Sequence, residues 1–415
     1  MGTSRSTRWI AGAIAVSALL GCSLKANAQA PAYTVTDLGE VPGATGGTIV
    51  GDINNRAQVA ASSIFRSPFH FQGFLWQNGN ITVLPSLGGT KTFALGINQP
   101  GDIAGAASLP GDTANHATLW HQGQPLDLGT LGGSNSGAEA VNDLGQVTGG
   151  SDVIISGATV THAFFWGHGI MSDLQTLGGD FSYGFAINNQ GQVTGQSDVT
   201  TVPDPTFGIP SFHGFFWHDG QLVDFGPIFG GNFNYGQDIN ENVIVGAADL
   251  AGDLAAHGFV WQNGVVTDLG TFPGDDSSAA LGINDFGSIV GISAQSPTDF
   301  FEPPSEEFNC PCHAALWTNG QVVDLNTLIP ANSGWQLTIA IAINDRGQII
   351  GQGTFNNNPR SFLLTPIRGL TSGLPASASA ESLTSGGAQA SVAQVIRHRG
   401  ETRFVMQVGG STGKP

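Results

Sequence analysis

The sequence predicts an all-β protein: a seven-bladed β-propeller with four antiparallel strands per blade and a last blade closed by both termini. Three observations predict this fold. Glycine accounts for 61 of 415 residues and charged residues for only 11%, which favours short strands and tight turns over helices. Three sequence blocks recur along the chain, and six tryptophans mark their register at spacings of 44–56 residues. A period of this length is typical of one four-stranded blade.

The first hairpin of each repeat is predicted from a turn that reads Ile-Asn-x-x-Gly or close to it. Asparagine starts a type I turn, and glycine takes the left-handed position that follows. The copy at residues 239–246, INENVIVG, lacks the turn glycine, so its hairpin is expected to differ. The turn asparagines are Asn54, Asn98, Asn142, Asn188, Asn240, Asn284 and Asn344. Seven first hairpins predict seven blades.

The second hairpin is exemplified by residues 162–174, HAFFWGHGIMSDL. A two-residue turn at His168-Gly169 places Phe164 opposite Asp173, and His162 then lies diagonal to Asp173 at about 7 Å between backbones. The same pairing is predicted for His116 with Asp127, His162 with Asp173, His213 with Asp224, His257 with Asp268 and His313 with Asp324. Active sites are usually unique in a chain, whereas packing devices repeat. The pairs are therefore interpreted as structural, and no catalytic residue is predicted.

The two ends of the repeat region complete each other. Residues 33–43 match a fourth strand with no third strand before it, and residues 360–366 match a third strand with no fourth. Joined together they make one more blade, which leaves no sheet edge exposed. An open β-solenoid is the alternative, but it would not need a split end unit.

These blocks resemble the HAF-type bacterial extracellular repeat family, named for its His-Ala-Phe triplet. The resemblance covers about residues 33–366, although the triplet itself is exact only at residues 162–164. The DLGTLGG and INxxGQVxG blocks recur with fewer changes between repeats than the triplet does. The resemblance implies export and a propeller-like repeat. It implies no activity.

Residues 1–28 are predicted to be a signal peptide. Arg5 and Arg8 precede a short apolar core, and residues 26–28 form a small-x-small cleavage site. The protein is thus expected to be secreted, periplasmic or at the cell surface, with lipoprotein processing at Cys22 as the less favoured alternative. The propeller is assigned to residues 29–367, and residues 368–415 to a low-complexity linker with a short hairpin-like tail.

The net charge and the motifs in the sequence limit which partners and cofactors are expected. Removing the signal peptide leaves 10 basic side chains against 31 acidic ones, which excludes nucleic acid as a partner. No stretch beyond the signal is apolar and long enough to span a membrane. Cys310 and Cys312 are a possible local disulfide. Neither a metal site nor a cofactor motif is recognised, and a monomer is expected.

The predicted function rests on the segments that do not repeat. Insertions at residues 197–212, 293–312 and 329–337 are expected on one face of the ring. Aromatic and acidic residues on long loops over a rigid scaffold suit ligand binding. The candidate binding residues are Asp204, Phe207, Phe300, Phe301, Glu302, Glu306, Glu307, Phe308 and Trp335.

These residues favour a non-enzymatic scaffold that binds an extracellular protein or glycan. On this interpretation the chain is not an enzyme. Two alternatives remain open. One is a propeller hydrolase or lyase that acts on polysaccharide with acids from these loops. The other is a purely structural cell-surface protein.

Overall fold

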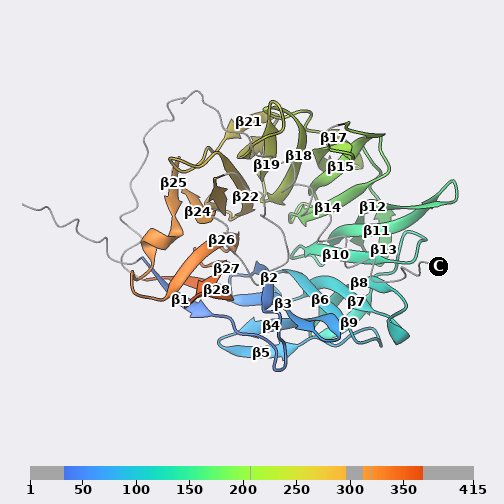
Figure 1. Ribbon diagram of the computed structural model, residues 1–415. Coiled ribbons are helices and arrows are strands. Elements are labelled where there is room, and N and C mark those ends of the chain that lie inside the picture. Colours follow the sequence, from blue (N-terminus) through green and yellow to red (C-terminus); the bar gives the residue numbers. More distant parts are fainter. Residues whose placement is uncertain (1–31, 206, 296–311, 319, 368–415) are drawn as a thin grey trace, which may run out of the picture.

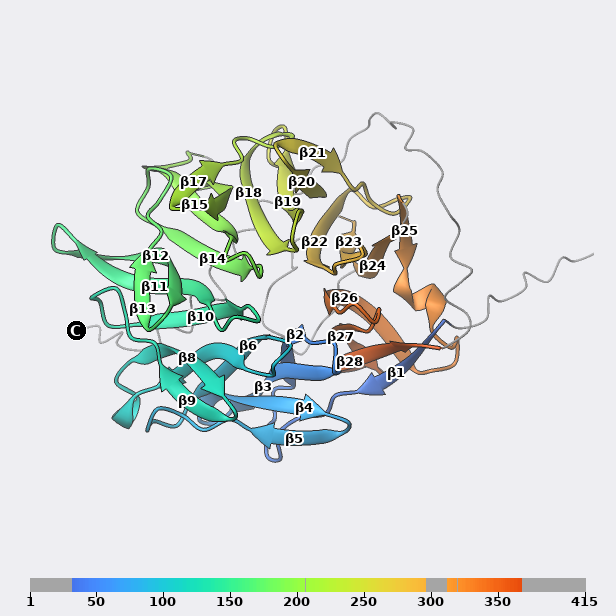
Figure 2. The same ribbon diagram turned by 180° about the vertical axis from the view of Figure 1, so that it is seen from behind.

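The computed structural model describes residues 32–205, 207–295, 312–318 and 320–367. Within these residues the regular elements are β-strands, apart from two short 3-10 helices, η1 (Pro110–Asp112) and η2 (Leu325–Leu328). The strands form antiparallel sheets that surround a common centre (Figure 1; Figure 2 shows the opposite side). The all-β, propeller-like part of the prediction is therefore confirmed.

The strands group into repeat units of four, numbered here from the N-terminus. Unit 1 contains β2 (Thr48–Ile53), β3 (Gln58–Arg66), β4 (Phe69–Gln77) and β5 (Asn80–Val83). Unit 2 contains β6 (Thr92–Ile97), β7 (Ile103–Ser108), β8 (Asn115–His121) and β9 (Gln124–Asp127). Unit 3 contains β10 (Ser136–Val141), β11 (Val147–Ile155), β12 (Ala158–Gly167) and β13 (Ile170–Asp173). In each unit the sheet order follows the chain order.

Units 4 and 5 are hydrogen-bonded into one eight-stranded sheet, but a single parallel bridge between Phe212 and Phe233 joins them. Unit 4 contains β14 (Ser182–Ile187), β15 (Val193–Pro203), β16 (Pro210–His218) and β17 (Gln221–Asp224). Unit 5 contains β18 (Gly230–Ile239), β19 (Ile244–Leu250), β20 (Ala256–Gln262) and β21 (Val265–Asp268). Unit 6 contains β22 (Ser277–Ile283), β23 (Ile289–Ala294), β24 (Cys312–Thr318) and β25 (Gln321–Asp324).

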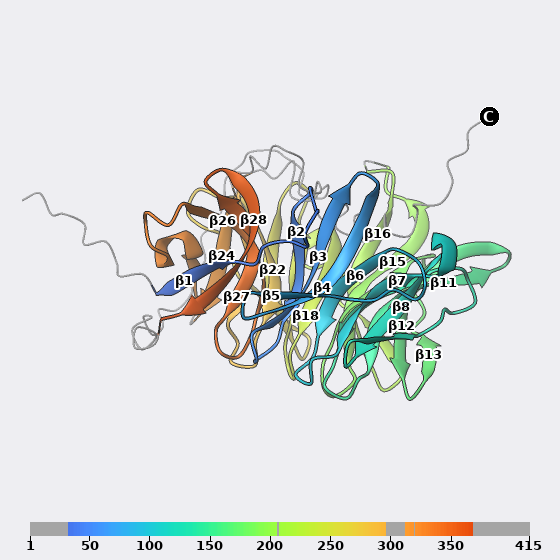
Figure 3. The same cartoon turned by 90° about the horizontal axis from the view of Figure 1, so that it is seen from below.

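The remaining sheet is built from both ends of the described chain. It contains β26 (Trp335–Ile343), β27 (Ile349–Phe355), β28 (Asn358–Pro366) and the N-terminal strand β1 (Tyr33–Asp37). β1 pairs antiparallel with β28, and Asp37 lies opposite Phe362 (Figure 3 shows the two strands side by side). This register equals that of Asp173 opposite Phe164 in unit 3. The N-terminal strand thus takes the place of a fourth strand, as the sequence predicted.

The first strand of each unit is the innermost one, and each innermost strand contacts the next. The turn asparagines connect them, because each side-chain amide donates a hydrogen bond to the backbone carbonyl of the next turn asparagine. Asn54 donates to Asn98 (3.0 Å), Asn98 to Asn142 (3.0 Å), Asn142 to Asn188 (2.8 Å), Asn188 to Asn240 (3.2 Å), Asn240 to Asn284 (3.1 Å), Asn284 to Asn344 (3.1 Å) and Asn344 to Asn54 (2.8 Å). The series of bonds therefore returns to its start. Asn240 makes the same hydrogen bonds with neighbouring turn asparagines as the others do, although its turn lacks the glycine.

A β-bulge interrupts every innermost strand three residues before the turn asparagine. In unit 2, for example, the register shifts between Ala94 and Gly96, which leaves Leu95 as the extra residue. Gly105 pairs with Ala94 beside the bulge, and a Cβ at Gly105 would lie 1.9 Å from the carbonyl oxygen of Phe93. This close approach explains the last glycine of the INxxGQVxG block.

Candidate active site

The extra residues of the bulges line the inner side of the sheets. They are Gly51, Leu95, Glu139, Phe185, Gln237, Leu281 and Ile341. Phe185, Leu281 and Ile341 belong to one apolar cluster with Tyr183 and Tyr235, although they come from three different units. Side chains from several innermost strands can meet only where those strands converge, near the centre.

The residue that follows the bulge is small in five units and acidic in the other two. It is occupied by Gly96, Ala140, Ala186, Gly282 and Ala342 in five units and by Asp52 and Asp238 in the other two. Asp52 and Asp238 are half-buried. Two units thus place a carboxyl group where the others leave room for no more than a methyl group.

Both carboxyl groups reach toward the next innermost strand. Asp52 accepts hydrogen bonds from the backbone N–H of Ile53 at 2.7 Å and of Ile97, on β6, at 3.3 Å. Asp238 makes the same pair of contacts with Ile239 and Ile283, each at 2.8 Å. These bonds fix the two side chains in equivalent orientations.

The pKa values of both aspartates are raised. Burial, with a smaller contribution from the charge of Asp238, raises the pKa of Asp52 to about 7 despite its two backbone hydrogen bonds. Burial raises the pKa of Asp238 to about 6, against the hydrogen bonds from Ile283 and Ile239. The charge of Asp238 thus acts on Asp52, and both carboxyl groups titrate closer to neutrality than an ordinary aspartate.

Further acids lie one residue beyond the turn asparagines. This position holds Asn55, Gln99, Asp143, Asn189, Glu241, Asp285 and Asp345. Several of these side chains accept the backbone N–H of the equivalent residue in the preceding unit, for example Asp143 from Gln99 at 2.8 Å and Asp345 from Asp285 at 3.0 Å. Burial raises the pKa of Asp285, and the charges of Asp345, Glu241 and Asp143 raise it further. We call Asp143, Glu241, Asp285 and Asp345 the acidic rim.

This arrangement has the features of general acid–base catalysis. Such chemistry needs two titratable groups whose surroundings push their pKa values toward the working pH and give them different protonation states. Asp52 and Asp238 meet the first part of this condition, because both pKa values are raised toward neutrality, and the acidic rim adds negative potential beside them. The sequence does carry a signal for this pair, because Asp replaces the usual Gly or Ala two residues before the turn asparagine. The pair was not among the residues predicted to be functional.

The insertion residues predicted to bind a ligand take different places. Phe207 packs edge-on against Phe233, 5.5 Å between ring centres, and joins the central apolar cluster. Asp204 accepts a hydrogen bond from Phe207 N–H (3.2 Å) and so closes its own loop. Trp335 contacts Phe355 and Phe362 in another cluster. The structure does not bring Phe207 and Trp335 together. Phe300, Phe301, Glu302, Glu306, Glu307, Phe308 and Cys310 lie outside the described residues.

The insertion between β15 and β16 and the aspartate pair lie at opposite ends of the strands. β14 runs toward the turn asparagine Asn188, and β15 runs back to Pro203, where the insertion begins. Asp52 and Asp238 are two residues before their own turn asparagines. The acids of the candidate site therefore come from the strands themselves.

The predicted His–Asp contacts are present in all five units. The histidine Nδ1 lies 2.8 Å from a carboxylate oxygen in His116–Asp127, 2.9 Å in His162–Asp173, 2.9 Å in His213–Asp224, 2.9 Å in His257–Asp268 and 3.7 Å in His313–Asp324. In the shared sheet Arg360 takes the histidine position and forms an ion pair of 3.5 Å with Asp37. Their repetition in unit after unit agrees with a packing role, which stays a prediction.

Three further observations concern the described residues only. Cys312 forms a disulfide. No helix in the described part of the chain is long and apolar enough to cross a membrane. The same residues contain no group of three or more His, Cys, Asp or Glu side chains placed to hold a metal ion.

Comparisons with known proteins show which solved structures have a similar fold. No family model and no curated protein matches the sequence. Among solved structures, a puromycin-hydrolysing peptidase of Mycobacterium tuberculosis matches 82% of this chain with a TM-score of 0.51 and 9% identity, and the chain spans about half (55%) of that peptidase. The β-propeller domain of the Trilobed protease of Pyrococcus furiosus matches 67% of this chain and 95% of its own length, with a TM-score of 0.34 and 6% identity. A gluconolactonase of Xanthomonas campestris matches 81% and 90%, with a TM-score of 0.38 and 10% identity.

These matches correct the expectation that the chain is not an enzyme. The solved structure that it matches with a TM-score of 0.51 is a peptidase, which is an enzyme. At identities this low the likeness itself carries the fold and no particular reaction.

Proposed function

We propose that this chain is a propeller hydrolase that acts on a neutral polysaccharide, with Asp52 and Asp238 as its acid–base pair. One observation carries the proposal: two units replace a small residue with an aspartate beside the centre, and both carboxyl groups have pKa values near neutrality. The fold is shared with hydrolases such as the peptidase above. That likeness supports a hydrolytic enzyme but does not select the bond.

The chemistry follows from the protonation states. Asp52, protonated below about pH 7, donates its proton to the glycosidic oxygen as the bond from that oxygen to the anomeric carbon breaks. Asp238, ionised above about pH 6, takes a proton from a water molecule as the water oxygen bonds to the anomeric carbon. The acidic rim stabilises the positive charge that develops on the sugar ring.

The substrate class follows from charge. The acidic rim places four carboxylates beside the pair. An anionic polysaccharide would be repelled at this end of the molecule, whereas a neutral one would not. A neutral polysaccharide outside the cell also fits the export that the predicted signal peptide and the HAF-type resemblance would imply.

The proposal includes a closed ring of seven blades. The hydrogen bond from Asn344 to Asn54 and the contact of β26 with β2 support closure. Closure matters for the site because it would place unit 1 and unit 5 around one centre, where the charge of Asp238 acts on Asp52.

The test is a substrate panel. The full chain is incubated at pH 6.5 with neutral polysaccharides (starch, xylan, galactomannan), with an anionic one (polygalacturonate) and with peptides, and new reducing ends or amines are measured. We expect reducing ends from at least one neutral polysaccharide. Asp52→Ala, which introduces the residue that Ala140 provides in unit 3, should lower the rate by about 10²-fold or more.

The matched control is Asp219→Asn, because the Asp219 side chain is 97% exposed. It should leave the rate unchanged. Thermal melting confirms that each variant folds. Cleavage of peptides alone, or a folded Asp52→Ala variant with full activity, would overturn the proposal.

A further inference from the structure

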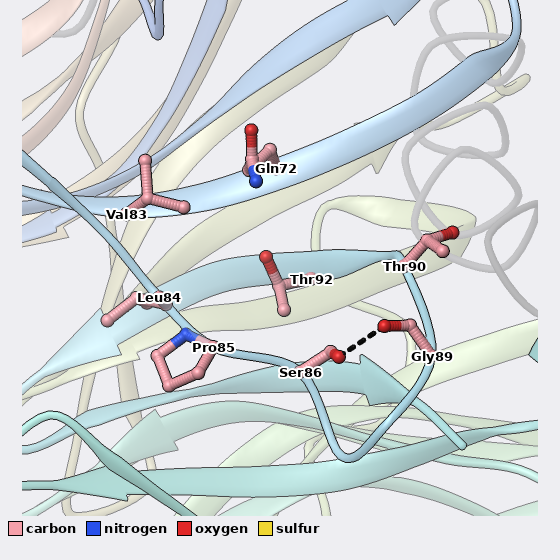
Figure 4. Close-up of a pocket in the computed structure, with 8 residues that line it drawn as sticks. All are labelled: Gln72, Val83, Leu84, Pro85, Ser86, Gly89, Thr90 and Thr92. Atoms are coloured by element: carbon pink, nitrogen blue, oxygen red, sulfur yellow. Dashed lines mark hydrogen bonds between the residues drawn. The ribbon is translucent and has the colours of Figure 1, made fainter. Parts of the chain in front are cut away.

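Unit 1 and the start of unit 2 form a pocket at the strand ends opposite to the turn asparagines. It has a volume of about 280 Å³ and is lined by Gln72, Val83, Leu84, Pro85, Ser86, Gly89, Thr90 and Thr92 (Figure 4). Its walls come from β4, from Val83 at the end of β5 with the segment that follows, and from Thr92 at the start of β6 in unit 2. No charged side chain lines it.

The pocket lies where unit 1 lacks the His–Asp pair. Val83 lies opposite Phe74 as Asp173 lies opposite Phe164, and Gln72 lies opposite Ser63 as His162 lies opposite Ser151. Gln72 and Val83 therefore occupy the histidine and aspartate positions. Gln72 makes no side-chain hydrogen bond within the described residues.

In unit 1 the loop after Val83 also differs from the other units, because it lacks the N–H group that would bond to an aspartate. In sister units the aspartate accepts the N–H of the residue two places later, as Asp127 does from Gly129 at 2.8 Å. Unit 1 has Pro85 at that place, which has no N–H to donate. The two replacements together remove the bonds that would close this loop against β4.

Thr92 provides a buried donor without an acceptor. It is 4% exposed, and its hydroxyl oxygen accepts a hydrogen bond from Gly73 N–H at 2.9 Å. In units 3 and 4 the equivalent serines also donate, Ser136 to Gly129 and Ser182 to Gln175. The carbonyl at the equivalent place is that of Pro85, which accepts from the Trp120 indole at 2.8 Å and makes no bond with Thr92. Within the described residues the Thr92 hydroxyl donates no hydrogen bond, so its proton is available to a molecule that enters the pocket.

We propose that this pocket binds one neutral sugar unit. Thr92 offers a donor, Gln72 both donors and an acceptor, and Val83, Leu84 and Pro85 an apolar wall, a combination that matches a sugar ring with its hydroxyls. The volume is just under the 300–1,000 Å³ of drug-sized sites, which suits a single ring. The choice of a sugar over a peptide rests partly on the proposed function, because the pocket would hold the same polysaccharide away from the acids.

The test measures binding directly, with ligand-observed NMR on the full chain and the probes glucose, galactose, mannose, xylose and a tetra-alanine peptide. The double variant Gln72→His, Val83→Asp restores the sister pair and fills the pocket, and it should lose sugar binding at least 10-fold. The matched control is the reverse change in unit 2, His116→Gln with Asp127→Val, which should leave binding unchanged. Thr92→Val should weaken binding, and Thr92→Ser, which keeps the hydroxyl, should retain it.

The outcomes separate this inference from the proposed function. Sugar binding that depends on Gln72 and survives Asp52→Ala supports the pocket, whether or not the chain is a hydrolase. Sugar binding that survives in the double variant, binding of the peptide alone, or no binding of any sugar overturns it.

Discussion

The side-chain amide of Asn344 donates a hydrogen bond to the backbone carbonyl of Asn54, 2.8 Å away. This bond joins the last innermost strand to the first. The same contact links every other neighbouring pair of innermost strands. One repeated residue thus connects the units and also closes its own turn, since Asn344 accepts the N–H groups of Arg346 and Gln348 at 3.0 Å.

Asn344→Ala is expected to lower the free energy of unfolding by about 1–3 kcal/mol, because buried backbone groups lose their partners. Asn142→Ala, the equivalent change in unit 3, should cost a similar amount. Chemical denaturation measures both. If Asn344→Ala costs nothing while Asn142→Ala costs as expected, the ring is not closed between Asn344 and Asn54.

The His–Asp pairs should contribute unequally to stability, in order of burial. The His162 side chain is 4% exposed, whereas that of His313 is 44% exposed and 3.7 Å from its partner. His162→Ala is expected to cost about 1–3 kcal/mol, and His313→Ala less than about 1 kcal/mol. Denaturation midpoints give the comparison. Equal losses at both sites would contradict a packing role that depends on burial.

Arg360 and Asp37 provide the corresponding pair at the junction of the two ends. Their side chains are 39% and 40% exposed, and the ion pair is 3.5 Å long. Arg360→Ala should therefore change the free energy of unfolding by less than about 1 kcal/mol, and the change should shrink at 1 M salt. A loss of several kcal/mol that persists in high salt would show that the junction depends on this ion pair.

The half-buried aspartates with raised pKa values should make the stability of the fold decrease as pH rises. The pKa values of Asp52, Asp198 and Asp238 are raised in the folded chain to about 7, 7 and 6, mainly by burial. Their stabilisation is complete below the unfolded pKa near 4 and is lost as pH rises through the folded values. We expect a lower melting temperature at pH 8 than at pH 5, and a smaller difference for Asp52→Asn.

The titration of Asp224 and Asp268 has the opposite effect on the pH dependence of stability. Burial alone would raise their pKa values, but hydrogen bonds from His213 and His257 and from backbone N–H groups lower them. Their stabilisation is present above the unfolded pKa and is lost as pH falls through the lowered folded values. This loss lies well below pH 5, so it leaves the comparison between pH 5 and pH 8 intact. A melting temperature that rises from pH 5 to pH 8 would contradict the raised pKa values.

Repetition explains how much of the fold the sequence predicts. Asn54 and its equivalents mark the first hairpin of each unit, and a turn signal that recurs is far more informative than a single copy. The split sheet of β1 and β28 follows from counting incomplete units. The bulges were not predicted, because an extra residue such as Leu95 changes no recurring letter.

The candidate site was harder to predict because it depends on deviations within the repeat. Asp52 and Asp238 stand out only when their position is compared across units, and their pKa values depend on burial that the sequence does not display. Gln72 and Val83 stand where other units have the repeated histidine and aspartate, but the pocket beside them depends on how β4 and β6 pack together. Neither the aspartate pair nor the pocket lies in one of the long insertions.

The pH dependence of polysaccharide hydrolysis tests the central claim most directly. The full chain should show a bell-shaped kcat/KM profile with its maximum at about pH 6–7, the acid limb set mainly by ionisation of Asp238 and the alkaline limb by loss of the Asp52 proton. Asp52→Asn should abolish most activity, and Asp219→Asn should reproduce the unaltered profile. No hydrolysis of any neutral polysaccharide, or a profile that Asp52→Asn leaves unchanged, would contradict the account.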